Sequence, residues 1–343
     1  MKTMKTIALI ALIAIFTNCS KNDEAKGSPA DKPANIILKP NVSADNSGTV
    51  AFTVTADNAV SYEFDFGNGV FQNSITGNVT YRYPVAGTYT VKVTAKSQSG
   101  KITVKSMQIT VSATEALVWA DEFDVAGAPD PGKWGYDLSN NNGWGNGELQ
   151  YYTNRTDNAV VSSGTLKINA KKETYSGFGY TSARLLTKGK FNFKYGRLEV
   201  KAKLPAGVGT WPAIWALGSD IDTNPWPGCG EIDIMEQTGN DKTKVLGTLH
   251  YPGRSGGNAD GSNTTVNTAT SDFHVYALQW DATAIKISVD GVVYKTLANS
   301  SSVPFNHNFF VILNVAMGGS LGGTVDPNFT SSTMEIDYVR YYQ

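Results

Sequence analysis

The sequence predicts an all-β protein that contains one small and one large β-sandwich. Short runs of alternating polar and apolar residues recur along the 343-residue chain, and turn residues that include 34 Gly separate them. Few stretches have the periodicity of an amphipathic helix. The length suits one large and one small domain, and a hydrophobic content of 41% allows a substantial core. A net charge of -1 excludes a strongly basic surface, so we expect no nucleic-acid partner.

Residues 1–19 are interpreted as a lipoprotein signal peptide. A basic start precedes an apolar run from Ile7 to Phe16, which is too short to anchor the chain across a bilayer. The segment ends at Cys19, which we expect to carry lipid; an ordinary secretory signal with an incidental cysteine is the alternative. The stretch CSKNDE resembles the export signal of surface-exposed lipoproteins in some Gram-negative bacteria. We therefore expect a cell-surface protein held on the outer membrane, with residues 20–33 as a flexible tether.

Residues 34–113 are expected to form the small sandwich. The stretches AFTVTA, GTYTVKVTAKS and KSMQITV alternate as short strands do, with turns between them. YEFDFGNG and YRYPVAGTYTVKVTA together resemble the polycystic kidney disease (PKD) domain, an immunoglobulin-like module, although Asn68 stands where that family usually has Asp. We expect a spacer that lifts the next module off the membrane, and the sequence leaves open whether it binds sugar.

Residues 114–343 are expected to form the large sandwich, because their length suits a single all-β domain. An Asp-Gly pair in SVDGVVY predicts a tight hairpin between two alternating strands. The first and last strands are expected to pair in one sheet. Candidate strands are ALVWADEF, TLKINAKKE, GRLEVKAKLP, EIDIMEQ, HVYALQWD, AIKISVDGVVYKTL, FFVILNVAM and TMEIDYVRYYQ.

One strand, in GEIDIMEQTG, carries three carboxylates: Glu231, Asp233 and Glu236. Side chains alternate along a regular strand, so Glu236 would face the core, opposite to the other two acids. A lone carboxylate there costs on the order of several kcal/mol. A β-bulge near Ile234 and Met235 would return Glu236 to the acidic face. The spacing therefore predicts a bulged strand, provided that the three acids work together.

Two carboxylates of unlike pKa can cleave a glycosidic bond, and a third negative charge raises the pKa of its neighbour. A hard-cation site and a solvated acidic face are the alternatives for such a cluster. Trp211, Trp215 and Trp144, the last among several asparagines, favour a saccharide cleft, because sugars offer C–H faces to aromatic rings and hydroxyls to amides. For each single tryptophan, core packing is an equally good interpretation.

The large module resembles glycoside hydrolase family 16, and most closely its laminarinases, on six stretches: WPAIWALG, GEIDIMEQTG, NNGWGNGELQYYT, SARLLTKGKFNFKYGRLEVKAKLP, LNVAMGGSLGG and IDYVRYYQ. The resemblance implies a β-jelly-roll with a concave cleft and a retaining, endo-acting hydrolase of β-1,3-glucan (laminarin). It implies a monomer that needs no cofactor for catalysis. By this resemblance Glu231 is the nucleophile, Glu236 the acid/base and Asp233 the assisting acid.

The same resemblance implies further site residues. His250 would lie close to the acid/base, with a cleft-wall role as the alternative, and the donor side of the cleft would be lined by Trp144, Asn146, Arg184, Trp211 and Trp215. A structural Ca²⁺ on the convex side would be held by Glu122, the carbonyl of Gly164 and Asp337. Oxygen ligands from distant parts of the chain fit the preferences of that cation.

Two alternatives to a laminarinase stay open. The first is another family 16 specificity, such as mixed-linkage 1,3-1,4-β-glucan. The second is a non-catalytic β-glucan-binding protein that keeps the fold and lacks the acids. The intact trio of Glu231, Asp233 and Glu236 favours the enzyme.

Overall fold

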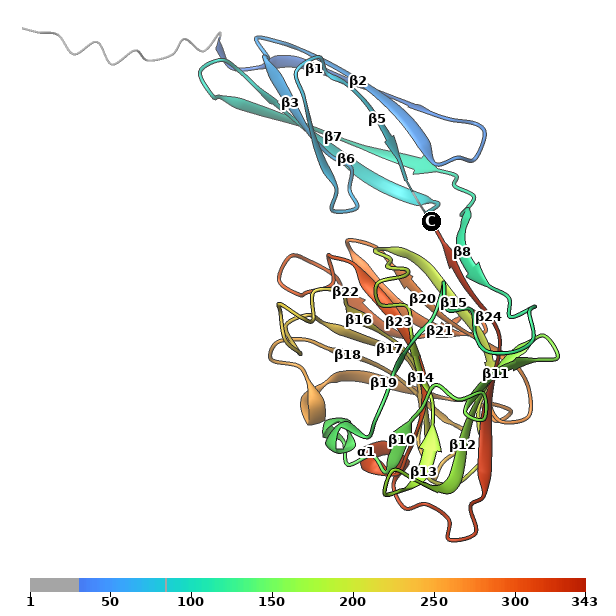
Figure 1. The fold of residues 1–343 in the computed structure, drawn as a ribbon. Helices are drawn as coiled ribbons and strands as arrows, with labels where there is room; N and C mark the ends of the chain where they lie inside the picture. Colours follow the sequence, from blue (N-terminus) through green and yellow to red (C-terminus); the bar gives the residue numbers. More distant parts are fainter. Residues whose placement is uncertain (1–30, 84) are drawn as a thin grey trace, which may run out of the picture.

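The computed structural model describes residues 31–83 and 85–343 and shows two β-sandwiches joined by a short link (Figure 1). The two main clusters of buried hydrophobic residues lie one in each module, within 38–111 and within 123–341. This architecture confirms the predicted all-β class. Among the described residues no helix is long and apolar enough to cross a membrane. The predicted signal peptide and Cys19 lie outside the described residues.

The small module packs a sheet of three strands against a sheet of four. In β6, Val91, Val93 and Ala95 point into the core and Lys92 points outward, as the alternating sequence predicts. The first sheet has the order β1 (Ala34–Val42), β2 (Thr49–Asp57), β5 (Asn78–Arg82), and the second has the order β4 (Phe71–Ser74), β3 (Ser61–Asp65), β6 (Gly87–Lys96), β7 (Ile102–Val111).

The large module packs a sheet of seven strands, here called the inner sheet, against a sheet of ten, the outer sheet. The inner sheet has the order β19 (Asp260–Thr265), β18 (Lys244–His250), β17 (Glu231–Gln237), β16 (Thr210–Gly218), β23 (Phe309–Met317), β14 (Arg184–Leu186), β9 (Gly135–Asp137). Eight strands of the outer sheet follow the order β10 (Gln150–Tyr152), β13 (Phe178–Ser182), β12 (Thr165–Tyr175), β24 (Ser331–Tyr342), β15 (Gly196–Lys203), β20 (His274–Trp280), β21 (Ala284–Val289), β22 (Val292–Ala298). The other two are β8 (Leu117–Asp121), which pairs with β24, and β11 (Ala159–Ser162), which pairs with β12.

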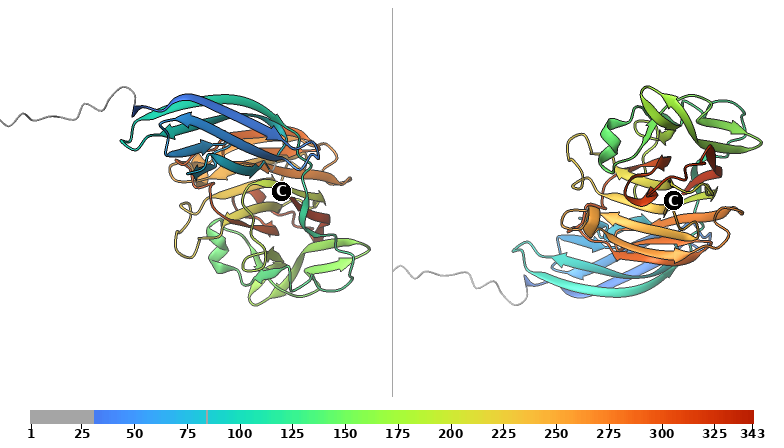
Figure 2. Two further views of the ribbon diagram at one scale, coloured as in Figure 1. Left: turned by 90° about the horizontal axis from the view of Figure 1, so that it is seen from above. Right: turned by 90° about the horizontal axis from the view of Figure 1, so that it is seen from below.

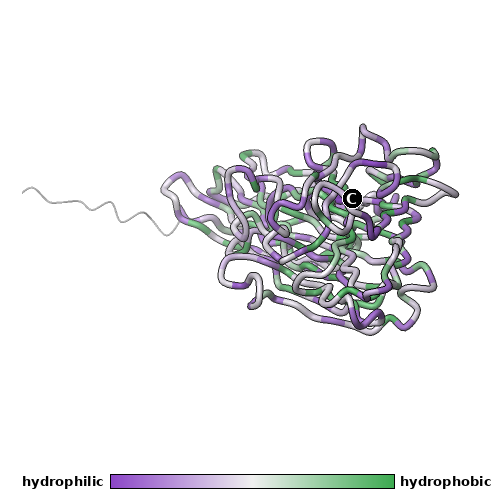
Figure 3. Tube along the Cα trace, turned by 60° about the horizontal axis from the view of Figure 1, so that its bottom comes forward, coloured by the Kyte–Doolittle hydropathy of each residue, from purple (hydrophilic) through white to green (hydrophobic). Residues whose placement is uncertain are grey.

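The core lies between the inner and outer sheets. Ile214 and Ile232 of the inner sheet and Val200 and Trp280 of the outer sheet are fully buried there. Along strands such as β15, fully buried and partly exposed residues alternate, and Figure 3 shows green and purple stretches interleaved along the tube. Because every second side chain of such a strand faces the core, the other face of the inner sheet is left free to carry polar groups.

Two local predictions are confirmed. The first and last strands of the module, β8 and β24, pair antiparallel, with Asp121 opposite Val339. Asp290 and Gly291, which join β21 to β22, both have positive φ, at 48° and 78°. Tight hairpins of this kind need positive φ at both central positions, and Asp-Gly supplies it at low cost.

The junction between the modules brings both ends of the large module together. The Thr114 amide donates to the Asn46 carbonyl at 2.7 Å, and Ala116 pairs with Gln343 at 3.0 Å. The C-terminus accordingly lies at the junction (Figure 1). In both views of Figure 2 the small module, blue, lies beside the orange strands β20, β21 and β22. Gly69 is so close to Ala282 that a Cβ at Gly69 would lie 2.4 Å from the Ala282 Cβ.

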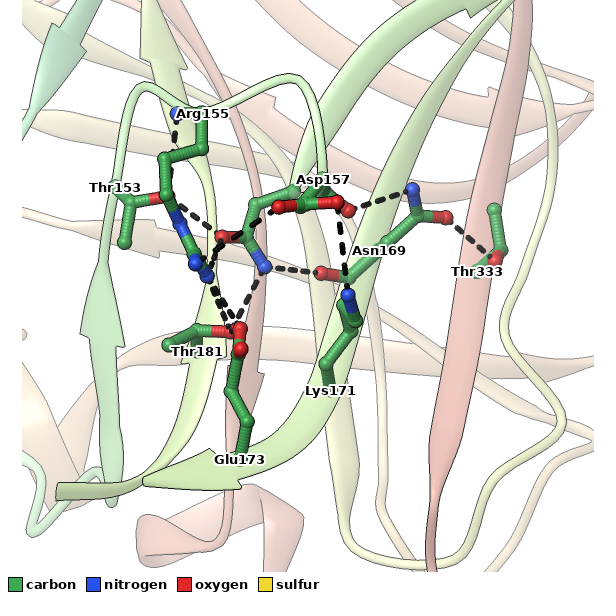
Figure 4. Close-up of polar contacts among 9 residues, drawn as sticks. Thr153, Arg155, Asp157, Asn169, Lys171, Glu173, Thr181 and Thr333 are labelled. Atoms are coloured by element: carbon green, nitrogen blue, oxygen red, sulfur yellow. Dashed lines mark hydrogen bonds and ion pairs between the residues drawn. The ribbon is translucent and has the colours of Figure 1, made fainter. Parts of the chain in front are cut away.

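A polar network fixes the loop that follows β10 (Figure 4). Arg155 forms an ion pair with Glu173 of β12. The buried Asn158 donates from its amide to the Asn169 carbonyl at 3.1 Å and to the Thr181 hydroxyl at 3.0 Å. Since β10 leads directly into this loop, the network ties the end of β10 to the neighbouring strands β12 and β13 of the outer sheet.

Candidate active site

The predicted β-bulge in β17 is confirmed. On the β16 side Ile234 has no partner, because the register shifts around it. On the β18 side, between the pairs formed by Asp233 and Glu236, the two residues Ile234 and Met235 stand opposite Gly247 alone. Ile234 and Met235 are both completely buried in the core between the sheets. The extra residue therefore turns Glu236 back to the face that carries Asp233.

Glu236 is oriented by two hydrogen-bond donors on neighbouring strands. The Trp211 indole nitrogen donates to Glu236 Oε1 at 3.0 Å, and the Thr248 hydroxyl lies 3.5 Å from Oε2. Burial raises the pKa of Glu236, while the Trp211 hydrogen bond acts in the opposite direction. A carboxyl group with a raised pKa keeps its proton to higher pH, as a general acid requires.

Glu231 and Asp233 form a second, tightly coupled part of the site. The pKa of both carboxyls is raised well above the usual range, first by burial and then by the repulsion of neighbouring carboxylates. His250 Nε2 lies 3.2 Å from Asp233 and 3.7 Å from Glu231, so His250 is placed beside these two acids rather than in contact with Glu236. The Glu231 side chain is the most exposed of the three acids, at 18%.

The donor atoms of Glu231, Asp233 and His250 lie within 4.8 Å of one another, which is close enough to hold a metal ion. Two carboxylates and an imidazole suit a divalent transition metal. A metal bound here would occupy the carboxylates that a sugar has to reach. The cluster therefore suits acid–base chemistry or metal binding, and the two would compete.

The guanidinium of Arg184 lies between two tryptophans, Trp144 and Trp215. Its Cζ is 4.4 Å from the centre of the Trp144 ring and 4.7 Å from that of Trp215. Its Nε lies 3.0 Å from Asp137 Oδ2, and the sequence analysis missed Asp137. Stacking with a cation fixes both indole rings, each interaction contributing about 0.5–2 kcal/mol. Three of the predicted substrate residues are thus brought together as one rigid wall.

The Trp144 loop has a left-handed backbone. Five consecutive residues from Asn141 to Gly145 have positive φ, which is unfavourable for residues other than glycine. The buried Asn140 side chain compensates locally: it accepts from the Gly143 amide at 2.8 Å and donates to the Glu148 carbonyl at 3.0 Å. The loop therefore presents Trp144 in one fixed position.

A buried polar chain under this wall was missed by the sequence analysis. Trp215 donates from its indole nitrogen to Asn314 at 2.8 Å, and Asn314 donates to the Tyr152 hydroxyl at 3.0 Å. The carboxylate of Glu148 accepts from Tyr152 at 3.3 Å and from the predicted Asn146 at 3.1 Å. An asparagine inside the apolar run FFVILNVAM was the available signal. These hydrogen bonds tie β16, β23, β10 and the loop before β10 to one another.

Strand pairing brings the three predicted calcium positions together on the outer sheet. Glu122 follows β8 and Gly164 precedes β12, and both strands pair with β24, which carries Asp337. Two carboxylates and a carbonyl are oxygen donors that suit calcium. Each carboxylate also has a cationic neighbour: Arg340 contacts both oxygens of Glu122 at 2.8 Å, and Lys201 lies 2.7 Å from Asp337. The hydrogen bond from Arg340 lowers the pKa of Glu122, and a cation at this place would compete with the Arg340 guanidinium for the carboxylate.

Comparisons with known proteins agree with this geometry. The sequence model of glycosyl hydrolases family 16 matches residues 146–340, and that of the PKD domain matches residues 36–111. The chain is 45% identical over 243 residues to a β-glucanase of Rhodothermus marinus, which covers 66% of this chain and 85% of that protein.

Two solved structures are similar to the large module. The laminarinase of Rhodothermus marinus has a TM-score of 0.64 at 44% identity and covers 67% of this chain and 98% of that one. LamA of Z. galactanivorans, solved in complex with laminaritriose and laminaritetraose, has a TM-score of 0.62 at 45% identity and covers 66% of this chain and 98% of that one.

Proposed function

The chain belongs to glycosyl hydrolases family 16, and on this premise we propose that it is an endo-acting hydrolase that cleaves β-1,3-glucan with retention of configuration. The observation that carries the proposal is the bulge in β17, which places Glu231, Asp233 and Glu236 on the cleft face of one strand. A strand keeps such a bulge beside an active site because it re-aims a side chain. The tryptophan wall next to these acids supplies the surface for sugar rings.

The acids take different roles according to their surroundings. Glu231 is the most exposed of the three and is assigned as the nucleophile. Burial and the nearby Asp233 raise its pKa, and the positive charges of His250 and Arg184 act in the opposite direction and favour the ionised form that attacks. Glu236, buried and held by Trp211, is assigned as the acid/base. Asp233 lies between them in the strand, where it orients Glu231 and helps by repulsion to keep the proton on Glu236.

The reaction then follows in two displacements. Glu236 gives its proton to the glycosidic oxygen as that bond breaks, while a Glu231 oxygen forms a bond to the anomeric carbon. The ionised Glu236 next removes a proton from water, whose oxygen attacks the anomeric carbon and releases Glu231. Two inversions restore the β configuration.

Product analysis on a panel of β-glucans tests the proposal. Laminarin should be cut into a ladder of short oligosaccharides, because an open cleft binds the chain internally. Faster cleavage of mixed-linkage 1,3-1,4-β-glucan would favour the alternative family 16 specificity. Binding of laminarin without any cleavage would mean a glucan-binding protein and would refute the enzyme.

We also propose a structural Ca²⁺ held by Glu122, the Gly164 carbonyl and Asp337. Calcium should raise the melting temperature of the chelated protein by roughly 5–10 °C, since a ligand at one hundred times its dissociation constant adds about 2.7 kcal/mol of stability. Activity well below the melting temperature should not change, because these residues lie on the outer sheet, away from the acids. Differential scanning calorimetry with and without calcium measures the shift.

Two variants separate the metal from the ion pairs at this place. Glu122→Gln should abolish the calcium-dependent shift. Arg340→Gln removes the competing guanidinium and leaves the carboxylates, so it should preserve or increase the shift. An unchanged melting temperature of the natural protein after thorough chelation, and again after calcium addition, would contradict the site.

We propose that lipid on Cys19 holds the protein on the outer membrane at the cell surface, with the PKD module as a spacer. The support is the apolar run from Ile7 to Phe16, the Cys19 that closely follows it, and the polar segment behind Cys19. Cys19→Ser should block processing or release the protein from the membrane fraction, because the thiol is the acylation site. Cell fractionation and surface proteolysis measure this. A variant that sediments with membranes as before would rule out the lipid anchor.

A further inference from the structure

Tyr294 of β22 reaches across from the outer sheet to the catalytic bulge. Its hydroxyl donates to the carbonyl of Ile234, the bulge residue, at 2.8 Å, and lies 3.4 Å from the carbonyl of Leu246 on β18. Its ring lies against Gly247, the residue opposite the bulge: a Cβ at Gly247 would come within 2.9 Å of the Tyr294 ring. One side chain thus contacts both strands where their register shifts.

A bulge interrupts the regular ladder, so the backbone groups around it need partners from elsewhere. The Tyr294 hydroxyl is such a partner for the Ile234 carbonyl, and the missing side chain at Gly247 makes room for it. Burial raises the pKa of Tyr294, and the nearby Glu236 and Asp233 raise it further. The hydroxyl therefore remains a neutral donor throughout the range in which the enzyme works.

We propose that Tyr294 is a positioning residue that holds the bulge of β17 and thereby keeps Glu236 in the cleft. In a regular strand Glu236 would face the core, because side chains alternate. Tyr294 does not touch the substrate side of the sheet, and it acts only through the strand that carries the acid. This inference rests on the proposed role of Glu236 as the acid/base.

Tyr294→Phe tests it, because it keeps the ring against Gly247 and removes only the hydroxyl. On laminarin, kcat should fall about ten- to a hundredfold with little change in KM, which is a partial loss of the roughly 10²–10⁴-fold contribution of general acid catalysis. On dinitrophenyl β-laminaribioside, whose leaving group needs no proton, the initial burst of dinitrophenol should fall less than about threefold. The alkaline limb of kcat/KM on laminarin should also shift, since it reports the pKa of the acid.

Tyr276→Phe is the matched control. Tyr276 of β20 is fully buried between the same two sheets, and among the described residues its hydroxyl has no hydrogen-bond partner. Removal of that hydroxyl should leave the rates on both substrates and the pH profile unchanged. Gly247→Ala is the second test variant: its Cβ displaces the Tyr294 ring, so it should reproduce the selective loss on laminarin. It decides the question alone if Tyr294→Phe fails to fold.

Equal losses on the two substrates, or no loss on laminarin, would overturn the proposal, because either result would reduce Tyr294 to a general packing role. A failure of the underlying function has a different signature. In that case the unaltered protein would not cleave laminarin, or Glu236→Ala would lose activity equally on laminarin and on the dinitrophenyl substrate. The same two assays on the unaltered protein, Tyr294→Phe and Glu236→Ala therefore separate the outcomes.

Discussion

Replacing Glu231 by alanine is expected to lower laminarin hydrolysis at least about a thousandfold, equivalent to about 4 kcal/mol of transition-state stabilisation. The substitution removes the oxygen that bonds to the anomeric carbon, so even a substrate with an activated leaving group should not react. Steady-state kinetics on both substrate types measure the loss. The control is Glu63→Ala, which removes an exposed carboxylate of the small module and should leave the rate unchanged.

The stereochemistry of the natural protein checks the same assignment independently. Proton NMR during hydrolysis should show the β-anomer first, because two displacements at one carbon restore its configuration. Azide added to Glu231→Ala would attack the anomeric carbon directly and give an α-glycosyl azide. If the α-anomer forms first from the natural protein, the reaction inverts and Glu231 is not the nucleophile.

Replacing Glu236 by alanine is expected to affect laminarin and a substrate with an activated leaving group differently. Laminarin hydrolysis should fall about a hundred- to ten-thousandfold, because the leaving sugar no longer receives a proton. Dinitrophenyl β-laminaribioside should still form the glycosyl-enzyme on Glu231 and then stall, since the base for the water step is missing. Azide needs no base and should restore turnover with a β-glycosyl azide as product. Burst kinetics and product NMR measure both effects.

The direction of the pKa shift of Glu236 predicts how the activity should depend on pH. Burial raises the pKa of Glu236 above its usual value, so the natural enzyme should stay active to higher pH than an ordinary glutamic acid would permit. In the azide-rescued Glu236→Ala variant the alkaline limb should disappear. An alkaline limb that persists there at the same pH would assign the titrating acid to Asp233 or another group.

Much of the fold could be read from local pattern. Alternation over a few residues identifies strands, and Asp290 with Gly291 identifies a hairpin, because both signals depend only on neighbouring residues. The spacing of Glu231, Asp233 and Glu236 was sufficient to predict the bulge, since a regular strand would bury one carboxylate in an apolar core. The resemblance to family 16 added residues such as Arg184, which no periodicity singles out.

What the amino-acid sequence by itself determined is therefore the strands, the two modules and the acids with their bulge, all of which follow from side-chain alternation and the cost of burying charge. Only the tertiary structure decided which distant residues support them. Asn314 contacts Trp215 on a neighbouring strand of the inner sheet. Tyr294 contacts the bulge from the other sheet. Contacts of that kind join residues far apart in the chain, and local pattern carries no signal for them. The physical reason is that a buried hydroxyl or amide forms its hydrogen bonds with whichever groups the fold places next to it, and these groups are distant in the sequence.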